Sequence, residues 1–441
     1  MTKRTGKSER KQGPRLADAN TMQGLFAGAV VDRLRQLLLP LVAGAADARR
    51  GVMQWSHDIG VEALKGIFLD DAVKIAGPKG KHQAVRTHHH WGWTPTTVEF
   101  GGRRLSVERP RVRERDGGEV MLPTVRRLQT FDPMPETALN QILLGVSTRG
   151  YDASIPAPPP GMKSRGTSRS AVSRKLVQRM SERMRAELAQ PLDGVPLLAM
   201  MVDGIGIGDH TVVVALGVTT DGTKIPLGLC LGSTENSTIC TALLHDLTAR
   251  GLKVEESILC VVDGGKGIRK ALRDVFGDLA IVQRCQIHKR RNVRDHLPKN
   301  RQGTVDRQLR DAYASSTVIL ARKRLKQLLS WLERNGEDGA AASLREGMEE
   351  TLTVLKLDLP PVLRAFFATT NAIENLMSVI RKTTRNVKRW RAPKMAKRWV
   401  AVSISHARAS FRRIKGNKNL PVLVANLRSL RKTLDHQEQV S

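Results

Sequence analysis

The sequence predicts an α/β core interrupted by an all-helical insertion, with a helical N-terminal region before it and basic helices after it. Three observations predict this fold class. Continuous apolar runs bounded by Gly and Asp turns indicate buried strands between residues 197 and 283. Apolar residues then recur at helical spacing from residue 288 to 367. Helical and strongly basic sequence follows to residue 434.

The N-terminal region, residues 21–190, follows a basic tail at residues 1–20 whose composition is typical of disorder. Helical spacing is clearest over residues 60–69, and residues 97–107 indicate two strands around a Gly-Gly turn. Residues 135–180 are a candidate helix-turn-helix. Its last helix, residues 164–180, carries Ser and Arg on one side and Val172, Leu176 and Met180 on the other. A recognition helix and an amphipathic linker helix fit this segment equally well.

The core has the clearest order of elements. Buried strands are predicted at residues 197–202, 211–218 and 225–231, the last two joined by a turn at 220–224. A helix at 238–250, a strand at 257–262, a helix at 267–276 and a strand at 279–283 follow. The order βββαβαβα is that of a ribonuclease-H-like fold, in which later strands are added through crossover helices. Residues 195–287 are therefore predicted as its first part.

Two helical segments complete the chain. Residues 288–367 are predicted as the all-helical insertion, with helices at 305–314, 318–331 and 339–353. Residues 368–441 contain a helix that carries Glu374 and then further basic helices.

The charge balance predicts a polyanionic partner. The chain of 441 residues has a formal net charge of +31, and nucleic acid is the obvious partner for such a chain. Between Glu374 and Asp435 there are seventeen Lys or Arg residues and no acid. A solvated face is the ordinary explanation of a charge run. A run this long would repel itself, however, so we expect it to bind DNA, and we assign DNA binding to residues 21–190 as well.

The remaining composition indicates a soluble intracellular protein. With DNA as its partner, we expect it in the cytoplasm, associated with the nucleoid. Four cysteines follow no disulfide framework of even spacings, which favours reduced thiols. The basic start of the chain is not a secretory signal, and no apolar run is long enough to span a bilayer. We therefore expect no membrane partner.

Three carboxylates are the candidate catalytic residues. Asp203 and Asp263 each follow a predicted strand, and Glu374 lies on a later helix. An Asp-Gly pair after a strand is most often just a turn. Together, however, three such carboxylates provide what a pair of Mg²⁺ ions needs for cutting and joining phosphodiesters. Asp221, between polar neighbours in a hairpin, is better interpreted as a turn residue.

The helix of Glu374 has two distinct faces. Asn371, Glu374, Ser378, Arg381 and Arg385 share one side, and the opposite side is apolar and predicted to be buried. Such a polar stripe is either ordinary surface or a metal ligand placed near side chains that contact DNA phosphates.

Other clusters are weaker signals. Cys285-x-x-His288 resembles half of a zinc site, but one pair supplies two ligands, so we expect the pair to support the site or the strand-to-helix junction. Three consecutive histidines, residues 88–90, point in different directions and are expected on a partly buried or DNA-facing surface. Trp331 is either core or a stacking platform for an unpaired base. The candidate DNA contacts are Arg169, Arg174, Lys175, Trp331, Arg381, Lys382, Arg385, Lys388 and Arg389.

These motifs together resemble the Mutator-type transposases, in the branch encoded by bacterial insertion sequences. The resemblance is carried by Asp203 in an apolar-run-Asp-Gly motif, by VVDGGKG around Asp263, by Cys285-x-x-His288 and by TTNAIEN around Glu374. The segments LLGVSTRGY and RPRVRERDG upstream add to it.

The resemblance implies a DNA transposase with a ribonuclease-H-like catalytic domain and Mg²⁺, or Mn²⁺ as a substitute, as cofactor. Asp203, Asp263 and Glu374 carry over as ligands of two metal ions, and Cys285, His288 and Asn371 as signature residues near the site. Such an enzyme binds the inverted repeats at the ends of its element and target DNA, as a homodimer or higher oligomer. Water first nicks the end, and the freed 3′-hydroxyl then joins the strands.

Two rival functions are kept. The first is a sequence-specific DNA-binding relic of a transposase that no longer cuts, although a pure binder has no use for clustered acids. The second is a ribonuclease-H-like nuclease that cuts branched DNA without joining strands.

Overall fold

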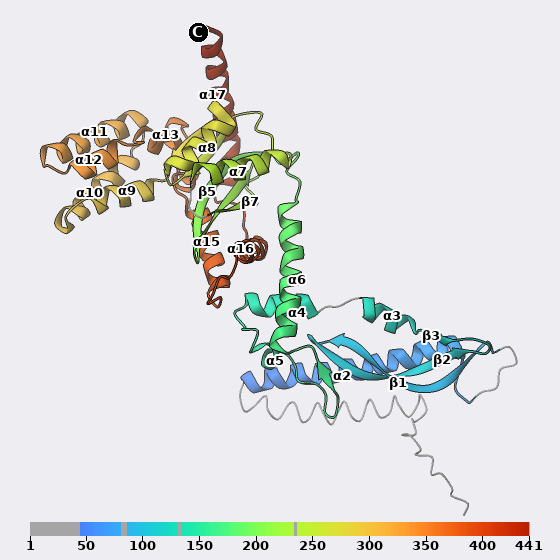
Figure 1. The fold of residues 1–441 in the computed structure, drawn as a ribbon. Helices are drawn as coiled ribbons and strands as arrows, with labels where there is room; N and C mark the ends of the chain where they lie inside the picture. The colour runs from blue at the N-terminus through green and yellow to red at the C-terminus, as the bar shows by residue number, and fades with distance from the viewer. Residues whose placement is uncertain (1–44, 81–85, 131–133, 233–235, 441) are drawn as a thin grey trace, which may run out of the picture. The chain divides into compact units, whose positions relative to one another are not determined.

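The computed structural model describes residues 45–80, 86–130, 134–232 and 236–440 (Figure 1). The chain divides into two compact units, one formed by residues up to Ala138 with Thr148–Val172, the other by Leu139–Ser147 with everything from Ser173 onward. The predicted tail at residues 1–20 lies outside the described residues. Within the described ranges, no helix is both long enough and apolar enough to cross a membrane.

The first unit is a small sheet packed on a long helix. The sheet has the order β1-β2-β3, and β4 also pairs with β2. Phe68 of the helix and Leu105 of the sheet are fully buried in the core between them. The elements are α2 (Ala45–Ala76), β1 (His88–Phe100), β2 (Arg103–Glu114), β3 (Glu119–Val120), α3 (Pro123–Thr130), α5 (Tyr151–Ser154) and β4 (Ser164–Arg165).

The β1–β2 hairpin is longer than the two strands predicted at residues 97–107. Gly101 and Gly102 form its turn with φ of +60° and +83°, a conformation that glycine adopts without strain. The pairing then continues as far as His88 opposite Glu114. The basic segment after residue 108 was not predicted as strand because Arg and Pro replace apolar residues in its alternation.

The candidate helix-turn-helix at residues 135–180 contains nearly all of α4 (Met134–Leu143) and the first part of α6 (Arg169–Leu188). The predicted helix at residues 164–180 begins later, because Ser164 and Arg165 pair with β2 as strand β4. It also continues further, to Leu188. Its predicted apolar side is confirmed, since Val172, Leu176 and Met180 are all buried.

The second unit is built around a five-stranded sheet with the order β7-β6-β5-β8-β9. The first three strands along the chain are antiparallel, whereas β8 and β9 are parallel to β5. This confirms the predicted order of elements between residues 197 and 283. The elements are β5 (Leu197–Ile207), β6 (His210–Thr219), β7 (Lys224–Gly232), α7 (Ser237–Ala249), β8 (Ile258–Val262), α8 (Lys266–Phe276) and β9 (Ala280–Arg284).

Strand β5 continues past Asp203, so the prediction that this residue ends the strand is wrong. The ladder with β6 pairs Asp203 with Val214 and runs on to Ile207 opposite His210. The glycine after Asp203 had indicated a turn, but the antiparallel partner supplies hydrogen bonds that prolong the strand. Asp203 therefore lies within a ladder, at the level where the parallel neighbour β8 ends.

Helices cover both faces of this sheet. The face that carries Met200 and Cys260 packs against α7 and α8 (Figure 1). The face that carries Met201 and Val261 packs against the C-terminal helices. Burial of one apolar side chain such as Met or Val contributes about 2 kcal/mol to folding stability. Packing on both faces therefore holds the sheet rigid. The C-terminal helices are α14 (Pro361–Phe367), α15 (Asn371–Thr384), α16 (Pro393–Arg408) and α17 (Leu420–Val440).

The insertion has a hydrophobic core of its own. Its predicted third helix, residues 339–353, is wrong as a single element. Glu346 is extended and Gly347 has φ of +64°, so the helix stops there. The break leaves the Glu346 carbonyl free to accept hydrogen bonds from the buried Arg284 and Lys289 side chains. The elements are α9 (Gln286–Asp295), α10 (Lys299–Tyr313), α11 (Val318–Arg334), α12 (Asp338–Arg345), a 3₁₀ turn at Glu349–Leu352 and α13 (Thr353–Lys356).

Candidate active site

Asp203 lies in β5, and Asp263 directly follows β8, the parallel neighbour of β5. Met201 of β5 is opposite Val261 of β8, and continuing that register by two residues sets Asp203 beside Asp263. Neighbouring strands are about 4.8 Å apart. Because side chains alternate along a strand, Asp203 lies on the face that carries Met201 and Val261. Asp263 is close enough for its charge to act on Asp203.

Glu374 reaches the same face of the sheet from α15. The helix packs there through Ile373, Leu376, Met377 and Ile380, all of which are buried with Met201 and Val261 in one cluster. The predicted two-sided helix is thus confirmed. Its polar side remains accessible, and the Glu374 side chain is 37% exposed.

The three carboxylates interact electrostatically. Burial raises the pKa of Asp203, and the negative charge of Asp263 raises it further, with a smaller effect from Glu374. The Gly204 amide and the positive charge of His288 oppose this rise. A carboxylate that is destabilised by neighbouring carboxylates is stabilised by a cation placed between them.

Backbone amides fix one oxygen of each aspartate. The Gly204 amide donates to Asp203 Oδ1 at 2.9 Å, and the Gly265 amide donates to Asp263 Oδ1 at 2.9 Å. Among the described residues, neither Oδ2 atom has a hydrogen-bond partner. These two oxygens therefore remain available to bind a cation.

Cys285 and His288 lie beside Glu374, together with Thr370. The Thr370 hydroxyl donates to Glu374 Oε1 at 2.7 Å and lies 3.3 Å from both Cys285 Sγ and His288 Nδ1. His288 Nε2 is 3.8 Å from Glu374 Oε1. A hydrogen bond with Cys285 raises the pKa of His288, and burial opposes the rise. For the Cys285 thiol, burial favours the neutral form, but hydrogen bonds with His288 and Thr370 outweigh it and lower the pKa.

Thr370 was not predicted from the sequence as a residue of the site. It is 1% exposed, and its hydroxyl touches three of the predicted site residues at once. Its contacts with Cys285 and His288 bridge segments more than eighty residues apart, which no local pattern reveals. The only signal was its place just before the helix of Glu374, where Thr commonly caps a helix.

Replacing Thr370 with Val is expected to lower the free energy of unfolding by about 1–2 kcal/mol, because a buried hydrogen bond to a carboxylate is lost without a change in shape. Chemical denaturation measures the change. Thr370→Ser keeps the hydroxyl and should retain most of that hydrogen bond. If the Val and Ser variants unfold at the same denaturant concentration, the hydroxyl does not hold Glu374.

The comparison with known proteins decides the family. A family model described as Transposase, Mutator family, matches residues 70–413, which include all three carboxylates and the Cys285–His288 pair. The chain belongs to the Mutator family of transposases. This confirms the family predicted from its motifs.

Curated relatives of this Mutator-family chain are transposases of insertion sequences. A probable transposase from Corynebacterium diphtheriae is 29% identical over 185 residues, 42% of this chain and 52% of that protein. The ISRM3 transposase of Rhizobium meliloti is 29% identical over 201 residues, 45% of this chain and 49% of that protein. The matches thus span about half of these two relatives. The IS406 transposase of Burkholderia multivorans is 27% identical over 344 residues, 74% of this chain and 84% of that protein.

The basic run after Glu374 divides into two parts in this Mutator-family chain. Arg408, Arg413 and Arg428 form ion pairs with acids from elsewhere in the second unit. From Arg381 to Arg398, by contrast, no cation has an ion-pair partner within 4 Å among the described residues. The candidate DNA contacts Arg381, Lys382, Arg385, Lys388 and Arg389 all belong to this unpaired part and are exposed.

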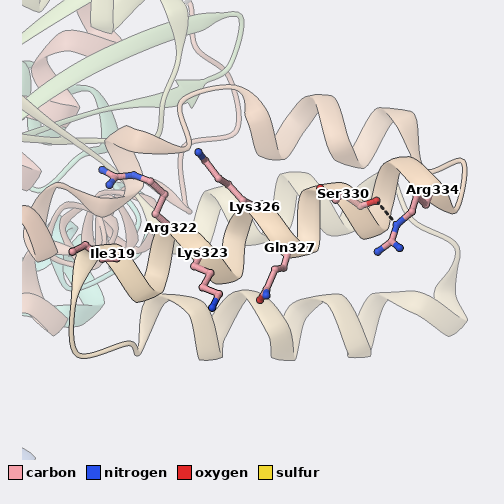
Figure 2. A pocket seen from close by; sticks show the side chains of 7 residues that line it. All are labelled: Ile319, Arg322, Lys323, Lys326, Gln327, Ser330 and Arg334. Atoms are coloured by element: carbon pink, nitrogen blue, oxygen red, sulfur yellow. Dashed lines mark hydrogen bonds between the residues drawn. The ribbon is translucent and has the colours of Figure 1, made fainter.

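A second cationic surface lies on the insertion, along α11. Figure 2 shows the side chains that line a shallow hollow there. Arg322 is held by Glu349, whereas Lys323 and Lys326 are exposed. Trp331, on the same helix, packs partly against the core of the insertion, with the Arg301 guanidinium 5.8 Å from its ring centre. The lining residues are Ile319, Arg322, Lys323, Lys326, Gln327, Ser330 and Arg334.

The remaining predicted contacts lie on α6. Arg169 and Arg174 of α6 are exposed, and Lys175 of the same helix is half-buried. The three histidines begin β1 and do not converge: His90 contacts the Gly77 carbonyl, whereas His89 stacks edge-on against Trp91. Their partly buried position agrees with the prediction.

Proposed function

We propose that this chain is a DNA transposase of the DDE type, which cleaves DNA strands at the ends of an insertion sequence and joins them to target DNA. The observation that carries the proposal is the placement of Asp203 in β5 and of Asp263 directly after the adjacent parallel strand β8. The helix of Glu374 packs on the same face of the sheet. The strand order β7-β6-β5-β8-β9, with three antiparallel strands followed by two parallel ones, supports a ribonuclease-H-like catalytic domain.

The residues at this site fit Mg²⁺. Carboxylate oxygens are the ligands that Mg²⁺ prefers, and no group in the described part of the chain donates to Oδ2 of Asp203 or Asp263. Bound Mg²⁺ would supply charge neutralisation on the phosphate and activation of the attacking oxygen. The protein's part is to fix both aspartates through the amides of Gly204 and Gly265, and Glu374 through Thr370. Asp203, central in the sheet, is the ligand shared by two ions in this proposal.

The proposed function assigns a role to each region of the chain. Residues 195–287 and the helix of Glu374 form the catalytic domain, 288–367 the insertion, and 21–190 the region that binds inverted repeats. The last helix of the range 288–367, α14, packs on the sheet with the C-terminal helices. A homodimer or higher oligomer on paired DNA ends is the expected assembly, because both ends of an element must be cut and joined together.

A nicking assay tests the proposal. Purified full chain is incubated with duplexes that carry the DNA flanking its gene, with Mg²⁺, with Mn²⁺ or with EDTA. A metal-dependent nick at the element end is expected, and its absence with both metals would favour the DNA-binding relic. A strand-transfer assay then separates the remaining rival, because a nuclease would not link the freed 3′-OH covalently to target DNA.

DNA affinity is expected to fall steeply with salt, because each neutralised phosphate contributes a slope of about −0.9 to log K against log salt concentration. Reversing two exposed cations of the unpaired part, Lys388→Glu with Arg389→Glu, should reduce the magnitude of the slope by about 2. Fluorescence anisotropy at several salt concentrations gives the slope. Lys253→Glu is a control, because Lys253 is exposed in the loop that precedes β8, whereas Asp263 follows the other end of that strand. An unchanged slope in the double variant would remove this stretch from the DNA surface.

A further inference from the structure

Glu374 also belongs to a second cluster of groups that can bind a metal ion. Cys285 Sγ, a ring nitrogen of His288 and a carboxylate oxygen of Glu374 lie within 4.8 Å of one another. The sequence argued against zinc because Cys285-x-x-His288 supplies only two ligands. Helix α15 provides the third, which sequence spacing does not reveal.

These ligands are held on rigid elements. Cys285 precedes α9, where its amide donates to the Val262 carbonyl at the end of β8 at 2.7 Å, and His288 lies one helical turn further on. Thr370 joins the start of α15 to the cluster through its amide, which donates to Cys285 Sγ at 3.4 Å. The Thr370 hydroxyl is within reach of His288 Nδ1, which leaves Nε2 on the side of Glu374. Partners that orient a ligand in this way are typical of metal-binding histidines.

The chemistry of this donor set favours Zn²⁺ over Mg²⁺. Thiolate and imidazole are common zinc ligands, whereas Mg²⁺ takes oxygen ligands. Two ligand atoms on one tetrahedral zinc ion are about 3.5 Å apart, so the three groups need to approach by about 1 Å. The Glu374 side chain is 37% exposed, so it is only partly enclosed by packed neighbours.

We propose that Cys285, His288 and Glu374 form a Zn²⁺ site that shares Glu374 with the carboxylate site. Zinc binding draws the Glu374 carboxylate toward Cys285 and His288. The same carboxylate then serves the aspartates less well, so zinc inhibits DNA cleavage in the presence of Mg²⁺. The expected inhibition of DNA cleavage rests on the proposed function, whereas the expected binding of Zn²⁺ does not.

Cobalt spectroscopy tests the binding without any catalysis. The full chain is titrated with Co²⁺ in the absence of DNA. We expect a thiolate-to-cobalt charge-transfer band in the near ultraviolet and strong visible bands of a tetrahedral ion. Zn²⁺ should abolish both and Mg²⁺ should not. Absence of the sulfur band in the wild-type chain overturns the proposal, whether or not the chain cuts DNA.

Variants assign the ligands. Cys285→Ser should remove the sulfur band, whereas Cys230→Ser, at a half-buried thiol on β7, should leave it intact. Glu374→Gln should keep the band but weaken Co²⁺ binding by at least about tenfold. This measurement still tests the ligand set if Cys285→Ser fails to fold. A sulfur band that persists in a folded Cys285→Ser variant, or Co²⁺ affinity unchanged in Glu374→Gln, contradicts this ligand set.

The inhibition is measured separately. Nicking in excess Mg²⁺ is followed as Zn²⁺ is added, and the half-inhibiting concentration should rise at least tenfold in Cys285→Ser. Equal inhibition of both chains would show that zinc acts elsewhere. A sulfur band in a chain without nicking activity would leave the zinc site standing and defeat the proposed function.

Discussion

Asp203→Asn is expected to reduce Mg²⁺-dependent strand cleavage by about a thousandfold or more, because a metal ligand supplies several kcal/mol of transition-state stabilisation and each 1.36 kcal/mol is tenfold in rate. Asp263→Asn and Glu374→Gln should have effects of similar size. Binding to DNA should remain. The measurement is single-turnover nicking of a duplex containing the element end, with DNA affinity determined in parallel.

The same substitution should stabilise the metal-free protein. The pKa of Asp203 is raised in the fold by burial and by Asp263, so its ionised form destabilises the folded state at every pH above the unfolded pKa. Asn carries no charge and removes that cost. Mg²⁺ should raise the melting temperature of the wild-type chain and leave that of Asp203→Asn nearly unchanged. Thermal melts with and without Mg²⁺ therefore report metal binding independently of catalysis.

Asp221→Asn is the matched control, with the opposite effect on stability. Hydrogen bonds from Thr219 and Thr223 lower the pKa of Asp221 to about 2, so its charged form stabilises the turn at neutral pH. That stabilisation is present above the unfolded pKa and is lost as the pH falls toward 2. The variant should cleave DNA normally and melt somewhat earlier. If Asp203→Asn cleaves as well as Asp221→Asn does, the carboxylates are not the catalytic centre.

The core strands were predictable because their signal is local. Residues 211–218 and 258–262 are nearly continuous Val, Leu, Ile, Ala and Cys, which only a doubly covered sheet can bury. The end of β5 was not predictable, since its last residues are held by pairing with β6 rather than by their own composition. The break at Gly347 likewise depends on Arg284 and Lys289, which are distant in sequence.

In the candidate site, too, some residues are identified by the local sequence and others depend on contacts between distant segments. Asp203 and Asp263 could be identified because each interrupts an apolar run with a charge, and Glu374 because its helix has one buried face. Thr370 could not be identified, because its role comes from contacts between two segments that are more than eighty residues apart. The third ligand beside Cys285 and His288 was hidden for the same reason: ligand geometry is a property of the packed fold.

Gly264→Ala is expected to cost about 3 kcal/mol or more of folding stability, since strained backbone and overpacking each contribute about 1–3 kcal/mol. Gly264 follows Asp263 directly and has φ of +100°, which L-residues rarely adopt. A Cβ atom there would lie 2.0 Å from Nε of Arg284. Arg284 is 3% exposed and donates to the Glu346 carbonyl at 3.0 Å, so it cannot move away without breaking the contact between the sheet and the insertion.

Gly303→Ala separates this steric effect from the general effect of adding a methyl group. Gly303 lies inside α10, is exposed, and has no atom within 4 Å of a built Cβ. Ala favours a helix interior over Gly, so this variant should be more stable than the wild type by up to about 1 kcal/mol. Chemical denaturation of both variants measures the contrast. Because Gly264 adjoins Asp263, its replacement should also impair cleavage. If Gly264→Ala is as stable as the wild type and nicks DNA as well, Arg284 does not pack against the loop after β8 as described.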